Sequence, residues 1–126
     1  MKKKYVERYL DEVSKIAKAI DKNKINKVIN RLVKLRKEKG RIFFIGVGGS
    51  ASNCSHAVND FRKIAQIESY TPVDNVAELT ARTNDEGWDT VFSAWLERSR
   101  INNKDLLFVL SVGGGNIKKN VSVNLI

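Results

Sequence analysis

Two short segments rich in glycine and serine carry the residues best suited to bind a ligand. The first reads Gly46-Val-Gly-Gly-Ser-Ala, the second reads Ser111-Val-Gly-Gly-Gly, and each follows a run of apolar residues. Glycines let the backbone approach a ligand closely, and a helix that begins there offers free N–H groups and a partial positive charge. Ser50, Ser52 and Ser111 add hydroxyl donors. Together the segments predict a cradle for an anion, although either one alone is equally consistent with a tight turn.

His56 and Asp60 lie four residues apart in the segment that follows the first glycine-rich loop. On a helix this spacing places both side chains on one face, where an imidazole and a carboxylate can share a metal ion or move a proton. His56 is the one histidine of the sequence, and Cys54 falls on a different face of the same predicted helix. Zinc normally takes three or four protein ligands, so this pair is only part of a metal site. A lone histidine on a partly apolar helix is more often structural or exposed.

The apolar runs that precede the two loops, residues 41–46 and 106–111, predict buried strands. A third strand is expected at 66–70, ended by Thr71-Pro72. Strands that alternate with helices indicate a doubly wound α/β fold, in which a parallel sheet is covered on both faces and binds ligands at its carboxyl edge. The helix after the first loop has an expected inner stripe of Ala51, Cys54, Ala57, Val58, Phe61, Ile64 and Ala65.

The remaining segments of the second half give weaker signals. A helix is expected at 73–81, a polar irregular stretch at 83–87, and a further helix from Asn116 to the end of the sequence. Between them lies another expected helix, whose core face is formed by Trp88, Val91, Phe92, Trp95 and Leu96.

The first 41 residues carry the whole basic surplus of the chain, with 15 Lys/Arg against 5 Asp/Glu, whereas residues 42–126 carry 8 against 9. Apolar residues recur there at helical spacing on either side of a break near 21–24, which predicts two amphipathic helices. Their lysines fit a solvated face without the interleaved aromatics that stack nucleic-acid bases. No apolar stretch is long enough to span a membrane, no export signal is present, and the single Cys54 fits a reducing compartment. We therefore expect a cytoplasmic protein with neither a nucleic-acid nor a membrane partner.

Three segments, in the same order and spacing over residues 40–126, resemble the phosphoheptose isomerases of the sugar-isomerase (SIS) superfamily. Residues 46–61 resemble their Gly-Asn-Gly-Gly-Ser loop and a helix with His and Glu four apart. Residues 79–92 resemble their Asn-Asp segment, here Asn84 and Asp85, and the aromatic helix after it. Residues 105–116 take the place of their strand and Ser-Thr-Ser-Gly-Asn-Ser phosphate loop.

This resemblance implies an isomerase that converts sedoheptulose 7-phosphate into D-glycero-D-manno-heptose 7-phosphate through an enediol, for lipopolysaccharide or capsule synthesis. It implies zinc bound by His56 and Asp60, with both residues catalytic and Asp60 handling protons. It also implies a homotetramer or dimer with sites between subunits. The substrate-binding positions that it implies are Val47, Gly48, Gly49, Ser50, Asn84, Asp85, Ser111, Val112, Gly113 and Asn116.

The sequence departs from the family pattern in ways that keep other functions open. Val47 replaces the family's Asn, Asp60 is shorter than Glu, and Gly113 and Asn116 stand where two phosphate-binding serines are expected. The family also continues further, to another Gln and His of the metal site, so we expect this chain by itself to be inactive as an isomerase.

We divide the chain into oligomerisation helices (1–39) and a sugar-phosphate-binding domain (40–126). One alternative function is a non-catalytic SIS domain that binds a sugar phosphate. A dinucleotide-binding domain is the other, because Gly46-x-Gly48-x-x-Ala51 precedes Glu68 at about the distance of a ribose-binding acid.

Overall fold

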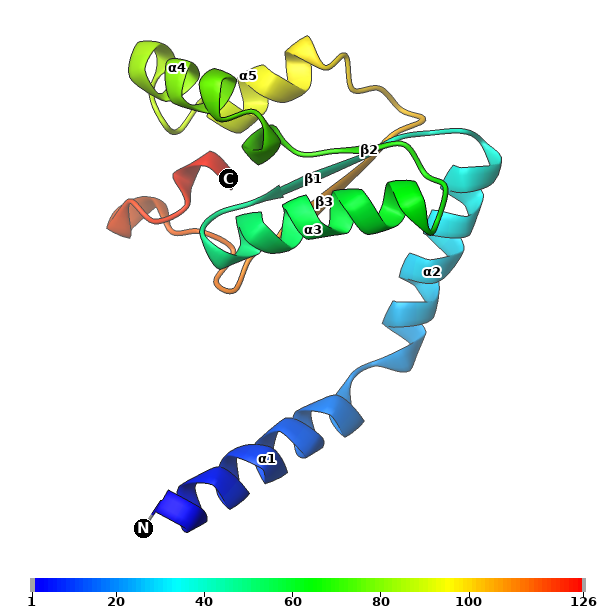
Figure 1. Ribbon diagram of the computed structural model, residues 1–126, viewed down its shortest axis with the longest axis vertical. Helices are drawn as coiled ribbons and strands as arrows, with labels where there is room; N and C mark the ends of the chain where they lie inside the picture. Colours follow the sequence, from blue (N-terminus) through cyan, green and yellow to red (C-terminus); the bar gives the residue numbers. More distant parts are fainter. Residues whose placement is uncertain (1, 126) are drawn as a thin grey trace. The chain divides into compact units, whose positions relative to one another are not determined.

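The computed structural model describes residues 2–125 and divides the chain into two compact units, Met1–Val33 and Lys34–Ile126. Met1 and Ile126, the outermost residues of the two predicted regions, lie outside the described residues. Helix α1 spans Lys2–Ala19 and helix α2 spans Lys22–Lys37, so α2 begins in the first unit and ends in the second (Figure 1). Asp21 separates them: its Oδ1 accepts hydrogen bonds from the backbone N–H groups of Asn23 and Lys24, which caps the start of α2.

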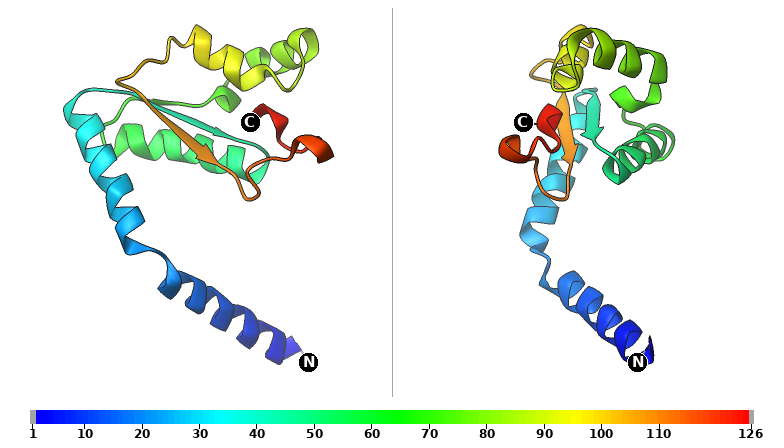
Figure 2. Two further views of the ribbon diagram at one scale, coloured as in Figure 1. Left: turned by 180° about the vertical axis from the view of Figure 1, so that it is seen from behind. Right: turned by 90° about the vertical axis from the view of Figure 1, so that its left-hand side faces the viewer.

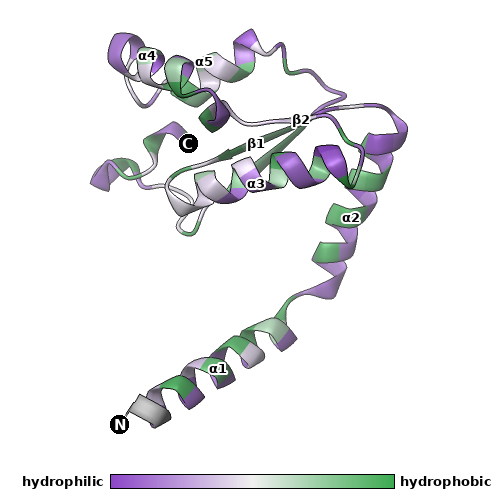
Figure 3. Ribbon diagram, in the orientation of Figure 1, coloured by the Kyte–Doolittle hydropathy of each residue, from purple (hydrophilic) through white to green (hydrophobic). Residues whose placement is uncertain are grey.

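The predicted pair of amphipathic helices is confirmed, and most of its apolar residues face solvent in the single chain, whereas Leu35 near the end of α2 is buried. Apolar and polar residues alternate along α1 and along the part of α2 in the first unit (Figure 3). Tyr9, Ile16 and Val28 are 55%, 68% and 41% exposed. No helix among residues 2–125 is long and apolar enough to cross a membrane.

The second unit is built on a parallel sheet of strand order β2-β1-β3, with β1 at Ile42–Gly46, β2 at Ser69–Tyr70 and β3 at Leu106–Leu110. The predicted doubly wound α/β fold is therefore confirmed. Ile42 pairs with Leu106 and Gly46 pairs with Leu110. Because this register aligns the carboxyl ends of β1 and β3, the two glycine-rich loops leave the sheet side by side.

Helices cover both faces of the central strand β1, every residue of which is buried (Figure 2). On one face Phe44 packs edge-on against Phe61 of α3, which spans Gly49–Lys63, with ring centroids 5.2 Å apart. On the other face Phe43 packs against Trp95 of α5, which spans Val91–Arg98, at 5.6 Å. This interleaving of aromatic rings anchors the strand that leads into the first loop.

An ion pair joins the starts of β1 and β3. Asp105, whose side chain is 2% exposed, accepts hydrogen bonds from the backbone N–H of Arg41 at 3.1 Å and from its Nη2 at 2.7 Å. Burial favours the neutral form of Asp105, but the hydrogen bonds from Arg41 and Asn102 outweigh it, and the pKa of the carboxyl is lowered. The Arg41–Asp105 ion pair fixes the register of β1 and β3, the two strands that lead into the glycine-rich loops.

Several predicted element boundaries were wrong between β1 and β3. The strand expected at 66–70 begins only at Ser69, because Gln66 has a positive φ of 56°. The helix expected at 73–81 is a 3₁₀ turn, η1 (Pro72–Asp74), followed by α4 (Val76–Glu86). Residues 83–86, predicted to be irregular, are the exposed last turn of α4, which Gly87 ends at a φ of 89°.

The helix predicted from Asn116 onward does not form within the described residues. Two 3₁₀ turns, η2 (Ile117–Lys119) and η3 (Val123–Leu125), occupy the segment, and Asn116 pairs with Val121 in an isolated antiparallel bridge. Asn120 and Ser122 adopt positive φ angles of 52° and 48°, which no α-helix accommodates.

Some side chains predicted to be in the core are also exposed. Strand β3 is half-buried instead of fully buried, since Leu107 and Val109 are 41% and 45% exposed. Ile64 is 73% exposed just after the end of α3, and Trp88 lies before α5 at 37% exposure. Trp95, Phe92 and Val91 of the same predicted stripe are buried as expected.

Candidate functional site

A cavity of about 390 Å³ lies at the carboxyl edge of the sheet, where both glycine-rich loops meet the C-terminal turns. Val47 and Ser50 enter it from the segment between β1 and the first turn of α3. Leu110 to Gly113 and Gly115 enter from the end of β3 and the loop after it. The remaining lining residues come from the C-terminal turns, and they are Asn116, Lys119, Val121, Ser122 and Leu125.

The first loop brings Ser50 close to the end of β1, and glycines make this possible. A Cβ atom on Gly46 would lie 2.9 Å from the backbone carbon and oxygen of Ser50, so any larger residue would push the helix away from the strand. Gly48 has a φ of 60°, a conformation that favours glycine. The backbone N–H of Ser50 donates to the carbonyl of Val47 at 3.2 Å, which closes the turn.

The second loop is closed by the Ser111 side chain, whose Oγ accepts a hydrogen bond from the backbone N–H of Gly114 at 2.9 Å. This leaves the hydroxyl proton of Ser111 available to a ligand. Gly114 has a φ of 68° and Gly115 one of 87°, so glycine is required at the turn. A Cβ on Gly113 would meet no atom within 4 Å, which keeps this side of the cavity open.

The structure gathers six of the predicted binding positions around the cavity. They are Val47, Ser50, Ser111, Val112, Gly113 and Asn116. Gly48 and Gly49 shape the same turn without lining the cavity. Asn84 and Asp85 lie in the last turn of α4, exposed, with the Asn84 amide donating to the Asp85 carboxylate at 2.8 Å. They do not line the cavity, and their role in binding stays a prediction.

Lys119 and Ser122 line the cavity and were missed by the sequence reasoning. The bridge between Asn116 and Val121 folds the chain back, and this turn brings Lys119 and Ser122 toward the loops. The available signal was the pair Asn116 and Asn120 on either side of two lysines, because asparagine favours turns and tolerates positive φ.

His56 and Asp60 are in contact on α3, with Nε2 and Oδ2 3.2 Å apart, and their side chains are 77% and 43% exposed. They do not line the cavity. His56 is six residues beyond Ser50 on the same helix, about 9 Å along its axis at 1.5 Å per residue. Within residues 2–125 no group of three or more His, Cys, Asp or Glu residues could hold a metal ion. The described residues thus offer two of the three or four ligands that zinc requires, and zinc binding stays a prediction.

Cys54, between the loop and this pair, is fully buried on the inner face of α3. Burial raises the pKa of its thiol, and the carboxylate of Asp74 raises it further. A buried, protonated thiol is a poor nucleophile and a poor metal ligand, so Cys54 acts as a core residue.

Glu68, the acid required for dinucleotide binding, accepts a hydrogen bond from the Tyr70 hydroxyl at 2.7 Å and does not line the cavity. The geometry therefore gives no support to the dinucleotide alternative.

Comparisons with known proteins agree on the family. The phosphoheptose isomerase of Buchnera aphidicola subsp. Schizaphis graminum is 29% identical over 126 residues, which is 93% of this chain and 64% of that protein. A probable phosphoheptose isomerase of Thermoplasma volcanium is 30% identical over 94 residues, 71% of this chain and 48% of that protein. The structure of phosphoheptose isomerase GmhA from Neisseria gonorrhoeae superposes with a TM-score of 0.77 at 22% identity, over 99% of this chain and 65% of that one.

The chain spans less than two thirds of the length of each of these relatives. The GmhA likeness, at 22% identity, establishes the fold. The sequence profile of the SIS domain matches residues 5–123, nearly the whole chain. This chain belongs to the SIS domain family.

Proposed function

We propose that this chain binds a sugar phosphate in the cavity at the carboxyl edge of the sheet, with the phosphate between Ser50 and Ser111. The observation that carries the proposal is the convergence of two serine-bearing glycine loops on one open cavity of about 390 Å³. Both serines supply hydroxyl donors, and the glycines bring backbone N–H groups within reach, which together suit phosphate oxygens. The names of the related proteins, phosphoheptose isomerases, point to the same class of ligand.

We propose sedoheptulose 7-phosphate as the substrate and D-glycero-D-manno-heptose 7-phosphate as the product. A base takes a proton from C1 to give the enediol, a proton is delivered to C2, and the hydroxyl proton of O1 passes to O2, so that no atom is gained or lost. Asp60 is proposed as the proton carrier and His56 as the group that pairs with it. The i, i+4 spacing on α3 supports this assignment, because it holds Nε2 of His56 and Oδ2 of Asp60 3.2 Å apart on one exposed face of the helix.

Since His56 and Asp60 do not line the cavity of their own chain, the proposal places them at the cavity of a neighbouring copy in a dimer or tetramer. The exposed apolar residues of α1 and α2 support assembly, because burying them between copies removes apolar area from water.

Measurements of ligand binding test the proposed site. Calorimetry should show that sedoheptulose 7-phosphate binds and that unphosphorylated sedoheptulose and NADH bind far more weakly. Ser111→Ala should weaken binding about ten- to a hundredfold, the cost of one charge-assisted hydrogen bond. Ser52→Ala is the matched control, because Ser52 lies in the first turn of α3 but does not line the cavity. Equal affinity of the wild type and the Ser111→Ala variant would disprove the cradle.

A non-catalytic sugar-phosphate-binding domain is the second candidate, favoured by the absence of a third metal ligand among the described residues. Proton NMR of the sugar in D₂O separates the two functions, because an isomerase exchanges the C1 proton with solvent and a binding domain does not. Exchange that is abolished by His56→Ala and by Asp60→Asn would support catalysis, whereas binding without exchange would support the second candidate.

A further inference from the structure

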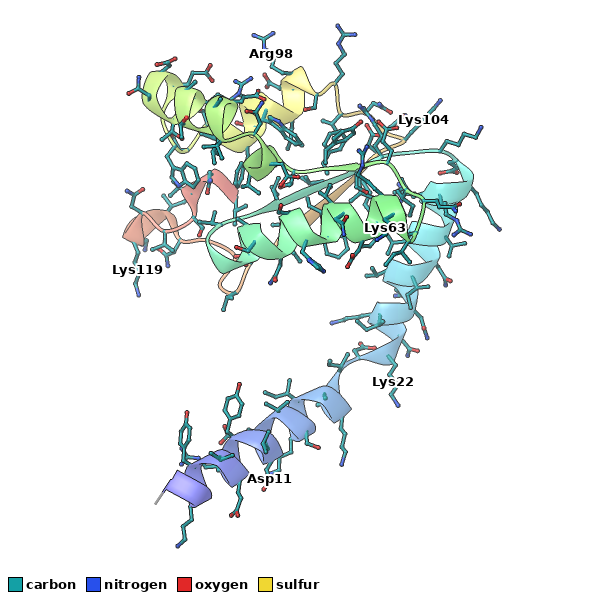
Figure 4. The ribbon with its side chains drawn as sticks, in the orientation of Figure 1. Asp11, Lys22, Lys63, Arg98, Lys104 and Lys119 are labelled. Atoms are coloured by element: carbon teal, nitrogen blue, oxygen red, sulfur yellow. The ribbon has the colours of Figure 1, made fainter. Side chains whose placement is uncertain are left out.

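The cavity has a charged residue that neither glycine-rich loop supplies. Lys119 lies on η2 (Figure 4) and lines the cavity beside Ser111 and Ser122. Of the lining residues it alone carries a charge, and no Asp or Glu of the described chain lines the same space. Within residues 2–125 its ammonium forms no ion pair. Lys119 is itself exposed. An exposed cation at the edge of a cavity that holds no counter-charge is suited to attract an anion.

Backbone contacts hold Lys119 in place, so its side chain is not needed for the turn. Its N–H donates to the Asn116 side-chain oxygen at 3.0 Å, and the N–H of Asn120 donates to the carbonyl of Ile117 at 3.1 Å. The bridge between Asn116 and Val121 completes the fold-back. Replacing the Lys119 side chain leaves all of these hydrogen bonds intact, and a change in ligand affinity would therefore report on the ammonium group.

We propose that Lys119 binds the phosphate group of the ligand and supplies the positive charge that the two loops lack. The inference rests on the proposed function, since it assigns a residue to the same cavity. Serine hydroxyls and backbone N–H groups are neutral donors, whereas a phosphate monoester carries between one and two negative charges near neutral pH. An ammonium group adds a charge-assisted hydrogen bond, which is about twice as strong as a neutral one. Gly113 and Asn116 leave the second loop poor in hydroxyls, and Lys119 compensates for them.

The experiment measures the affinity of the 126-residue chain for inorganic phosphate and for sedoheptulose 7-phosphate by calorimetry. Lys119→Ala should weaken both about ten- to a hundredfold and reduce the dependence of binding on salt. Lys119→Arg should restore most of the affinity, because it keeps the charge. Lys118→Ala is the matched control: Lys118 is exposed on η2 like Lys119 but does not line the cavity, and its loss should leave both affinities within twofold of wild type. Thermal unfolding of each variant confirms that the fold is kept, and Lys119→Gln replaces the alanine variant if that one does not fold.

The results of this experiment distinguish a wrong assignment of Lys119 from a wrong proposal of sugar-phosphate binding. If Ser111→Ala weakens binding and Lys119→Ala does not, the cavity is the phosphate site but the assignment of Lys119 is wrong. Equal losses in the Lys118→Ala and Lys119→Ala variants would also overturn the assignment, because they would reflect general surface charge. If the wild type binds neither phosphate nor the sugar phosphate, the proposed function and the inference fall together.

Discussion

Replacing Asp105 with asparagine should destabilise the second unit severely. The Asp105 carboxylate accepts five hydrogen bonds, three from Arg41 and two from Asn102, at distances of 2.7 to 3.1 Å. Asparagine keeps the shape but turns one acceptor oxygen into an NH₂ group that faces donors, and it leaves Arg41 without its counter-charge. Removing one partner of a buried ion pair costs about 3 to 5 kcal/mol, a large fraction of the 5 to 15 kcal/mol that roughly stabilises a typical domain.

Urea unfolding followed by tryptophan fluorescence measures this change, because Trp95 packs against β1. Glu86→Gln is the control: Glu86 forms a 3.3 Å ion pair with Arg82, is 49% exposed, and should cost about 1 kcal/mol or less. The native pKa of Asp105 lies below its usual value, so the stability from its ionised form is complete above about pH 4 and is lost as pH falls through the native pKa. The difference in free energy of unfolding between the wild type and Asp105→Asn should therefore become smaller at acid pH. A difference under about 1 kcal/mol at neutral pH, or one that does not change in acid, would refute the argument.

Three further predictions follow from the same structure. Gly46→Ala should lower both stability and phosphate affinity by forcing α3 away from β1, whereas Gly49→Ala, with nothing within 4 Å of its new methyl group, should be neutral or slightly stabilising in a thermal melt. Cys54 should resist alkylation by iodoacetamide in the folded chain at neutral pH and react fully in urea; rapid native labelling, read by mass spectrometry, would show that α3 is not packed as described. Light scattering at micromolar concentration should find a dimer or tetramer that high salt does not dissociate, since apolar faces of α1 and α2 hold it together, and a stable monomer would contradict this.

The strand and loop around Gly46 could be predicted from the sequence because two independent signals coincide there. The continuous apolar run of β1 is buried on both faces only as a central strand of the sheet, and the glycines that follow it predict the turn. The same reasoning located the Ser111 loop. It overstated the burial of β3, because Leu107 and Val109 are apolar like the residues of a central strand although one face of β3 is half-open.

The other errors arose where conformation depends on long-range or side-chain contacts. Residues 83–86 are polar because they form the last turn of α4, which is exposed on all sides, and composition alone does not distinguish such a turn from a loop. The pattern of apolar residues after Asn116 predicts a helix, because it does not reveal that Asn120 and Ser122 adopt positive φ angles. That error hid Lys119 and Ser122 from the predicted site.

The half-open strand β3 also bears on how this chain behaves at high concentration. Among the described residues β3 pairs with β1 alone, and its sequence Leu-Leu-Phe-Val-Leu has none of the lysines or prolines that usually protect an edge strand. Such an edge can template the addition of a strand from another molecule, which leads to aggregation unless another strand or helix covers it. This edge is therefore a second apolar surface of the chain, besides the apolar faces of α1 and α2, that can drive association. A single lysine in place of Val109 would act there as a gatekeeper without entering the cavity.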